Sequence, residues 1–512
     1  MPPINQSYLI SRTVKIAAGM LVFILLVIPG RAYPDDMENS LVRVMVTSQG
    51  FDAFMPWQKT DPAVRQGYGY LIGTNRVLTI AQLVRNHTLI ELQESLSGEK
   101  YTATVELSDK DANLAVLKIA DSARMPRLVP LGLAEKVLKD SPVQIVQFND
   151  TDGISRSSGT IVEISVADLP AGLGGVLAFT ALADMNVNGQ GAVVLHSNKV
   201  AGLIMWYDHN TRMGTLLPYP VLRHFIDDMA QPVYRGFAGA GFSWAPLVDP
   251  AERRYLKVDR LPGGIVVLKV RSGTGAAKSL LPQDVILEWD NCAVDKLGFY
   301  KDSEFGRLAF PYLIKGHRYP GDLVNAKIVR NGEIKAVSVE MTRRTDDQLL
   351  IPDNTSGEQA AYLADGGFLI RELTGDYLRA YGEGWNSSAD ARLVHLYLTS
   401  ADKPERPGDR VVIMSHVLPD PINVSYQHLR DQVITHINGD PVRNIDDVFT
   451  LVERDKGLRS FRLLSMSIDI ILDQATLEEA NKRIMRTYQI PHLRFKQTAK
   501  ASEEDDTKPG KK

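Results

Sequence analysis

The first half of the chain consists of short apolar runs that are separated by turn-forming residues. Between Leu41 and about Met229, segments such as LVRVMVT, GYGYLI, VLTIA and TATVEL alternate with breaks such as GTNR, NVNGQG and HSNK. Many short strands at this spacing are typical of an all-β barrel or sandwich. The segment from Pro220 to Met229 begins with proline and is apolar on one face, which predicts a closing helix.

Two related units follow. The segment 235–345 contains GIVVLKV, QDVILEWDNCAV and an Arg-Asn-Gly turn between two alternating runs, which is a strong hairpin signal. In the segment 366–475, RVVIMSHV resembles the first of these stretches and DQVITHINGDPV resembles the second. We therefore expect two copies of one module, followed by a C-terminal helix within 476–496 and a charged, solvated tail over 497–512.

Residues 1–32 predict a secretory signal peptide. Arg12 and Lys15 precede the apolar run 16–28, which is shorter than the ~20 residues that span a bilayer as a helix. Gly30 and Ala32 supply small residues before a cleavage point after Ala32. The expectation is an exported protein, periplasmic or secreted, and the alternative is an uncleaved N-terminal membrane anchor.

Composition argues against several functional classes. Lys and Arg total 58 against 61 for Asp and Glu, so the chain has no electrostatic footprint for nucleic acid. The only cysteine, Cys292, can form no intramolecular disulfide and no cysteine-based zinc site, and it is expected to be a packing residue. The ten histidines lack the short paired spacing of a metal site. We expect neither a metal nor a cofactor.

Between about Leu41 and Phe495, a series of stretches follows a specific order and spacing: PWQ, GYGYLI, VLTIAQLV, NHTLIELQ, DANLAVLKI, SGTIVEI, KVAGLI, MGTLLPYPVLRHFI, RGFAGAGFSW, YLIKGHRYPGD and VLPDPINVSYQHLRDQVITHINGDPVRN. In this order and spacing, the chain resembles the HtrA family of Do-like serine proteases, and the plant-type branch in particular. The resemblance implies a mainly β fold. It would comprise a chymotrypsin-type double β-barrel over 41–232 and two PDZ-like α+β domains over 235–345 and 366–475.

The same resemblance implies a serine nucleophile, a histidine base and an aspartate, and it places these roles on Gly189, Gln82 and Asn113. The amide of Gln82 cannot accept and return a proton near pH 7, and the amide of Asn113 cannot stabilise an imidazolium. Gly189 has no side chain, and Val187 stands where a glycine would help to shape the oxyanion hole. We expect no catalytic residue, because loss of such a set costs a factor on the order of 10⁶ in rate.

Three neighbouring residues have side chains that could replace the missing groups. Asp111 lies two residues before Asn113, His87 lies in the polar NHT stretch, and Ser197 lies in the LHSNK turn. None is expected to reach a vacant position. An active serine endopeptidase with an unrecognised triad remains the enzymatic alternative.

The glycine-rich stretch RGFAGAGF resembles the start of a PDZ domain. There, the backbone N–H groups of Gly239, Ala240, Gly241 and Phe242 would bind a peptide's C-terminal carboxylate, and the adjoining strand would pair with the peptide. An ordinary entry turn into a strand is the alternative. The stretch 366–370 looks like the matching loop of the second PDZ domain, for which we expect a role in assembly.

Phe51, Phe54 and Trp57 are large apolar residues in a loop that we place ahead of the barrel. The resemblance implies that they pack between protomers around a threefold axis, in a homotrimer or higher multiple. The expected function is an exported, inactive HtrA-like protein that binds peptides or unfolded proteins, or that scaffolds or regulates an active relative by mixed assembly. A structural envelope protein with closed PDZ grooves is the other alternative.

Overall fold

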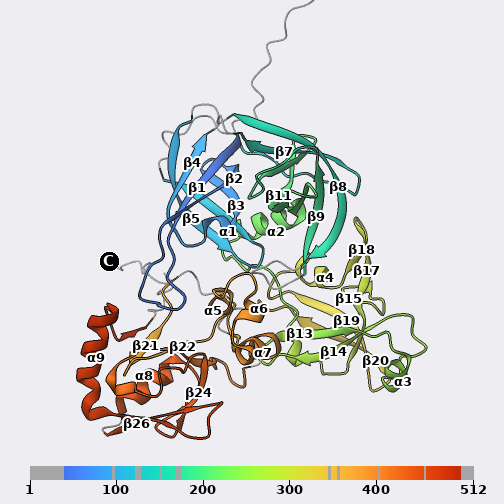
Figure 1. Cartoon of the computed structure of the whole chain (residues 1–512). Coiled ribbons are helices and arrows are strands. Elements are labelled where there is room, and N and C mark those ends of the chain that lie inside the picture. The colour runs from blue at the N-terminus through green and yellow to red at the C-terminus, as the bar shows by residue number, and fades with distance from the viewer. Residues whose placement is uncertain are drawn as a thin grey trace, which may run out of the picture.

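The structure is a computed structural model, and it describes residues 40–94, 98–120, 129–149, 153–167, 175–343, 348–353, 358–401, 404–454 and 457–496. The predicted signal peptide 1–32 and the predicted tail 497–512 lie outside these residues. Two barrels lie side by side in the upper part of Figure 1, and two further units lie below them. No helix in the described part of the chain is long and apolar enough to cross a membrane.

The first barrel is closed, with the strand order β1-β2-β3-β6-β5-β4. Alternation decides which side chains enter it: in β1, residues 42, 44 and 46 are buried and the residues between them are partly exposed. A one-turn helix, α1, follows β3. The bounds are β1 Leu41–Ser48, β2 Ala63–Gly73, β3 Arg76–Ile80, α1 Ala81–Val84, β4 His87–Glu94, β5 Lys100–Asp109 and β6 Leu114–Ile119.

The second barrel is also closed, with the order β10-β11-β12-β9-β8-β7. The helix α2 follows it, with Pro220 in its first turn and Val221, Leu222 and Phe225 buried, as the sequence predicts. The bounds are β7 Pro142–Phe148, β8 Ile154–Ala167, β9 Val176–Ala183, β10 Val193–His196, β11 Lys199–Asp208, β12 Met213–Pro218 and α2 Tyr219–Met229.

The third unit is a sheet with the order β13-β14-β15-β19-β20, in which β16 pairs with β15. The Arg-Asn-Gly turn joins β19 to β20, with positive φ at Asn331 and Gly332. The bounds are β13 Phe242–Pro246, α3 Pro250–Tyr255, β14 Ile265–Val270, β15 Val285–Trp289, β16 Cys292–Ala293, β17 Phe299–Asp302, β18 Gly306–Ala309, α4 Pro311–Lys315, β19 Leu323–Arg330 and β20 Glu333–Glu340.

The fourth unit has the order β27-β26-β24-β23-β22-β21-β28, with β25 beside β24. The bounds are β21 Tyr362–Asp365, β22 Phe368–Glu372, α5 Gly375–Arg379, α6 Trp385–Ser388, α7 Ala391–Ser400, β23 Val412–Val417, β24 Gln432–Ile437, β25 Asp440–Pro441, α8 Ile445–Arg454, β26 Leu458–Leu463, β27 Ile470–Asp473, α9 Gln474–Tyr488 and β28 Arg494–Phe495. The expected fold class, two barrels followed by PDZ-like units, is confirmed.

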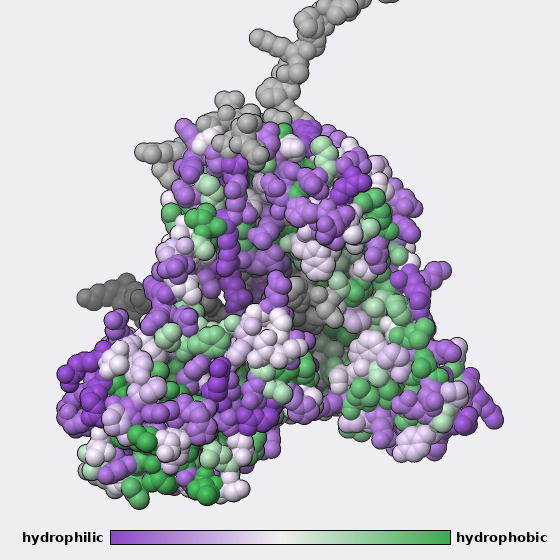
Figure 2. All heavy atoms as spheres, in the orientation of Figure 1, coloured by the Kyte–Doolittle hydropathy of each residue, from purple (hydrophilic) through white to green (hydrophobic). Residues whose placement is uncertain are grey.

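The hydrophobic core is continuous from the barrels into the third unit. One cluster of buried residues includes members of both barrels, of α2 and of the strands from β13 to β20, whereas the fourth unit has clusters of its own. On the face drawn in Figure 2, apolar residues also gather at the lower end of the fourth unit, where Leu458, Leu464, Ile468 and Ile471 are exposed.

The aromatic loop lies elsewhere than expected. It connects β1 to β2 inside the first barrel and reaches the fourth unit of the same chain, as the blue loop in Figure 1 shows. The ring of Phe54 lies 5.6, 5.1 and 5.6 Å from the rings of Tyr377, Tyr381 and His416, and that of Trp57 lies 5.7 Å from Tyr362.

Phe51 pairs with Lys59 at the base of this loop. The loop thus lies within the barrel and not ahead of it, and Phe54 and Trp57 contact the fourth unit of the same chain. Packing of these aromatic residues between protomers and the oligomeric state stay predictions.

Candidate active site and peptide-binding loops

Gln82 and Asn113 form a reciprocal pair of amides. The short helix α1 carries Gln82, and Asn113 ends the turn from β5 to β6 with a φ of +54°. The backbone N–H of Gln82 donates to Asn113 Oδ1 at 2.9 Å, and Asn113 Nδ2 donates to Gln82 Oε1 at 3.3 Å. The two positions assigned to the base and its orienting acid are thus joined in space.

Gly189 lies in the loop between β9 and β10 and has a φ of +89°. A Cβ at this position would lie 3.2 Å from Cβ of Tyr207 in β11. The Gln82 side chain donates to the carbonyl of Met205, two residues earlier in the same strand, at 3.0 Å. Gln82 and Gly189 therefore border one short stretch of β11, and Asn113 is linked to this stretch through Gln82.

This arrangement contains no apparatus for proton transfer. Both amides are neutral at physiological pH, and each uses its polar atoms on the other or on the backbone. The backbone N–H of Asn188, next to Gly189, donates to Gln147 Oε1 at 2.7 Å. Among the described residues, no group of three or more His, Cys, Asp or Glu is placed to hold a metal ion.

The three possible replacements lie away from this site or lack the needed contacts. Asp111 is buried in the β5–β6 turn rather than on a strand, and its carboxylate lies 3.9 Å from Arg343 Nε. His87 begins β4, and its Nδ1 lies 2.9 Å from the carbonyl oxygen of Val84. Ser197 occupies the exposed turn between β10 and β11. Among the described residues, no hydrogen bond or ion pair joins any of the three to Gln82 or Gly189.

The loop before β13 contains backbone N–H groups that make no hydrogen bond within the described structure. Gly239 donates its backbone N–H to Thr342 O at 2.7 Å, and Gly241 accepts from Arg271 N at 2.9 Å. The N–H groups of Ala240 and Gly241 donate to no residue that the structure describes. Phe242 is buried and begins β13, which is the end strand of its sheet in the described topology. A loop with free N–H groups beside an end strand is suited to an extended chain with a carboxylate terminus.

The corresponding edge of the fourth unit is covered by its own chain. The order β22-β23-β24-β26-β27 repeats the order β13-β14-β15-β19-β20 of the third unit, so β22 corresponds to β13. Here β21 pairs with the outer edge of β22 through four residue pairs, and β28 pairs with β21. The loop 366–367 between them is also engaged, since Gly366 N donates to Asn481 Oδ1 at 2.8 Å. No extended peptide can add to β22 in this state.

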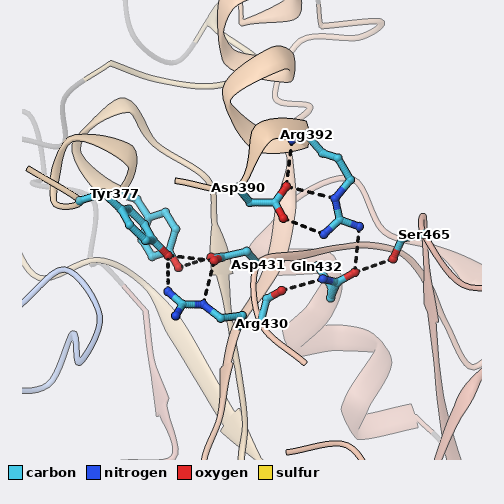
Figure 3. A network of polar contacts seen from close by, with 8 residues as sticks. Tyr377, Asp390, Arg392, Arg430, Asp431, Gln432 and Ser465 are labelled. Atoms are coloured by element: carbon cyan, nitrogen blue, oxygen red, sulfur yellow. Dashed lines mark hydrogen bonds and ion pairs between the residues drawn. The ribbon is translucent and has the colours of Figure 1, made fainter. Parts of the chain in front are cut away.

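A polar network holds the helical part of the fourth unit to its sheet (Figure 3). The carboxylate of Asp431 accepts hydrogen bonds from the hydroxyls of Tyr377 at 2.6 Å and Tyr381 at 2.8 Å, and Arg430 lies 3.1 Å away. Burial and Asp431 raise the pKa of Tyr377, so the phenol stays protonated. Phe54 packs on these two tyrosines, so the loop from the first barrel rests on a rigid support.

Comparison with known proteins agrees with this architecture. A family model described as a PDZ domain matches residues 351–496. Protease Do-like 2, chloroplastic, of Arabidopsis thaliana is 26% identical over 472 residues, which cover 91% of this chain and 76% of that protein. Putative protease Do-like 13 of the same plant is 25% identical over 473 residues, which cover 90% of this chain and 91% of that protein.

The chain is thus similar to Do-like proteases over most of its length. Among solved structures, the HtrA-type protease AlgW with decapeptide is similar to this chain, with a TM-score of 0.46 and 16% identity, covering 60% of this chain and 96% of that one. Within the family frame, the sequence led to Gln82, Asn113 and Gly189. Tyr207 was not predicted as part of this site, although the aromatic pair Trp206-Tyr207 ends the apolar run in KVAGLIMWYD.

Proposed function

We propose that this Do-like chain is an exported pseudoprotease that binds unfolded proteins or exposed C-termini through its first PDZ-like unit, alone or in mixed assembly with an active relative. The observation that carries the proposal is the amide pair of Gln82 and Asn113 beside a glycine at 189. A general base and a nucleophile are needed for acyl transfer, and neither residue type stands at these positions.

The binding activity is assigned to the loop 239–242 and the end strand β13. Strand addition supplies main-chain hydrogen bonds, and free N–H groups attract a terminal carboxylate. The fourth unit has the same strand order but a covered edge, which supports a structural or assembly role for it. In a multimer, the binding sites of several third units would strengthen each other's binding, because tethering raises the effective concentration of the second site.

The first experiment tests hydrolysis. The purified protein should not degrade casein and should not react with a serine-directed fluorophosphonate. An active Do-like protease serves as the positive control in the same buffer. Labelling of any serine, abolished by its alanine variant, would show that an unrecognised triad exists and would establish the enzymatic alternative.

The second experiment tests binding on a peptide array with free C-termini and on the same array with amidated C-termini. Ala240→Glu places a negative charge beside the free N–H groups and should abolish binding to free C-termini. Ala240→Gln has nearly the same volume without the charge and should retain most of it. Gly241 is unsuitable for such a change, because its φ is +69° and a Cβ would lie 2.7 Å from Thr274 Oγ1. Equal binding of the two variants would favour the structural-envelope alternative.

A third experiment tests export. The secreted or periplasmic form should begin at Tyr33, as determined by N-terminal sequencing. A membrane-bound species that retains Met1 would instead identify the N-terminal segment as an anchor.

A further inference from the structure

Tyr207 turns its side chain back towards the loop that carries Gly189. Its hydroxyl donates to the carbonyl of Met185 at 3.2 Å, and the backbone N–H of Val187 also interacts with this oxygen. The ring of His209 packs edge-on against the ring of Tyr207, with ring centroids 5.2 Å apart. The tyrosine is therefore held by contacts with the 185–189 loop and with the turn that follows its own strand.

The space beside Gly189 is filled by this residue. A Cβ at Gly189 would lie 3.2 Å from Tyr207 Cβ and 3.6 Å from its backbone nitrogen. A Cβ at Gly214, in the neighbouring strand β12, would lie 3.4 Å from Tyr207 Cδ2. The aromatic ring thus lies between the 185–189 loop and β12, and the glycines at 189 and 214 leave the room that it needs.

The position matters for any reaction at residue 189. A nucleophilic oxygen there would be carried on the Cβ, and the carbonyl carbon under attack would have to lie about 3–3.5 Å from that oxygen. The side chain next to that carbonyl needs space nearby, and the Tyr207 ring fills the space between the loop and β12. The Val187 N–H, at a position that the family resemblance assigns to the oxyanion hole, is also engaged by the tyrosine hydroxyl.

We propose that Tyr207 is an internal occupant of the substrate side-chain position beside Gly189, and that it excludes peptide side chains from this position independently of the lost triad. The proposal rests on the proposed function, in which the barrels do no chemistry. It deepens that function, because it directs all peptide binding to the first PDZ-like unit.

The test removes the Tyr207 side chain and adds p-cresol, a small molecule that has the same phenol ring. Tyr207→Ala in the full-length chain should open a pocket that binds p-cresol, with a Kd on the order of 1 mM. Binding is measured by isothermal titration calorimetry and by a rise in Tm of a few degrees with p-cresol. The wild type should not respond, and neither should Trp206→Ala, which removes the exposed neighbouring ring. Absence of saturable binding to folded Tyr207→Ala would overturn the proposal.

A second variant keeps the ring. Tyr207→Phe loses only the contacts of the hydroxyl with Met185 and Val187, so amide hydrogen exchange over 185–188 should become faster while p-cresol remains unbound. Unchanged exchange would also count against Tyr207 as the occupant that holds this loop. These readouts are independent of the fluorophosphonate result on the wild type, so failure of the inactive-protease proposal and failure of the occupant proposal are distinguishable.

Discussion

At the scale of single residues, the polar groups of Gln82 and Asn113 satisfy each other. An imidazole and a carboxylate at positions 82 and 113 would require a charge near the barrel rim, whereas two amides donate and accept without a desolvated charge. Asn113 also suits its backbone, because asparagine tolerates the left-handed conformation better than most residues with a Cβ.

Substitutions at Asn113 should separate the contribution of its side-chain hydrogen bond from that of its left-handed backbone conformation. Asn113→Ala loses the acceptor for the Gln82 N–H and puts alanine in a left-handed conformation, which together should cost about 2–3 kcal/mol. Asn113→Gly removes the same side chain without the backbone cost, and Asn113→Asp keeps the acceptor. In thermal unfolding we expect the largest loss of Tm for alanine, a smaller one for glycine and the smallest for aspartate. An alanine variant as stable as the aspartate variant would contradict this account.

The other informative residue is Asp111. Burial and the neighbouring Asp109 raise its pKa to about 6, even though Arg343 is near. An acid with a raised pKa binds its proton more tightly in the folded state than in the unfolded state. The contribution of Asp111 to the free energy of unfolding is therefore favourable below about pH 4 and is lost as the pH rises through about 6.

Asp111→Asn should accordingly stabilise the protein at pH 8, by at most about 2–3 kcal/mol, and confer no advantage at pH 4. The measurement is the difference in Tm between variant and wild type across this pH range. A difference that does not change with pH would show that Asp111 is ionised in the folded state throughout.

At the scale of elements, the hairpin β21–β22 closes the fourth unit. Its turn depends on Gly367, where φ is +86° and an added Cβ would lie 2.3 Å from Asn423 Nδ2 and from the Leu418 carbonyl oxygen. The amide of Asn423 donates to that carbonyl at 2.8 Å, so neither group can move freely. The closed edge is therefore supported by close packing at one glycine.

Gly408 provides a matched control, because its φ is +85° and no atom lies within 4 Å of an added Cβ. Gly408→Ala should cost only the backbone contribution of about 1–2 kcal/mol, whereas Gly367→Ala should cost clearly more. Amide hydrogen exchange over 362–372 should become faster in Gly367→Ala alone. Similar losses of stability in the two variants would mean that the turn can relax.

At the scale of the whole molecule, one loop joins the first barrel to the fourth unit. Besides its aromatic contacts, the loop accepts a hydrogen bond from buried Arg371 at the carbonyl of Ala53, and nearby Arg85 lies 2.6 Å from Asp376. The ion pair is exposed and contributes little, so the buried aromatic contacts hold the two units together.

Phe54→Ala should therefore release the fourth unit from the barrel. We expect a larger radius of gyration by small-angle X-ray scattering and faster proteolysis between 343 and 362. Phe51→Ala is the control, because Phe51 contacts Lys59 within the loop and has no ring contact with the described residues of the fourth unit. Unchanged scattering of the Phe54 variant would mean that other contacts suffice.

The sequence predicted what short-range patterns encode. Alternation of apolar and polar residues predicted the strands, proline predicted the start of α2, and the Arg-Asn-Gly turn predicted the β19–β20 hairpin. Family resemblance led to Gln82 and Asn113, which the structure joins. The sequence did not show that Phe54 contacts Tyr377, that β21 covers β22, or that Tyr207 turns towards Gly189, because these contacts depend on tertiary packing and leave no local period.

The loop that carries Phe54 also has a consequence for biosynthesis. Ala53 and its partner Arg371 are 318 residues apart, so ribosomes that add about 5–20 residues per second make the second tens of seconds after the first. During that interval the barrel can close, yet Phe54 and Trp57 have no surface to cover them. The nascent chain thus presents two bare aromatic rings throughout this interval, and a folding helper that shields such rings would be needed before the chain is complete rather than after it.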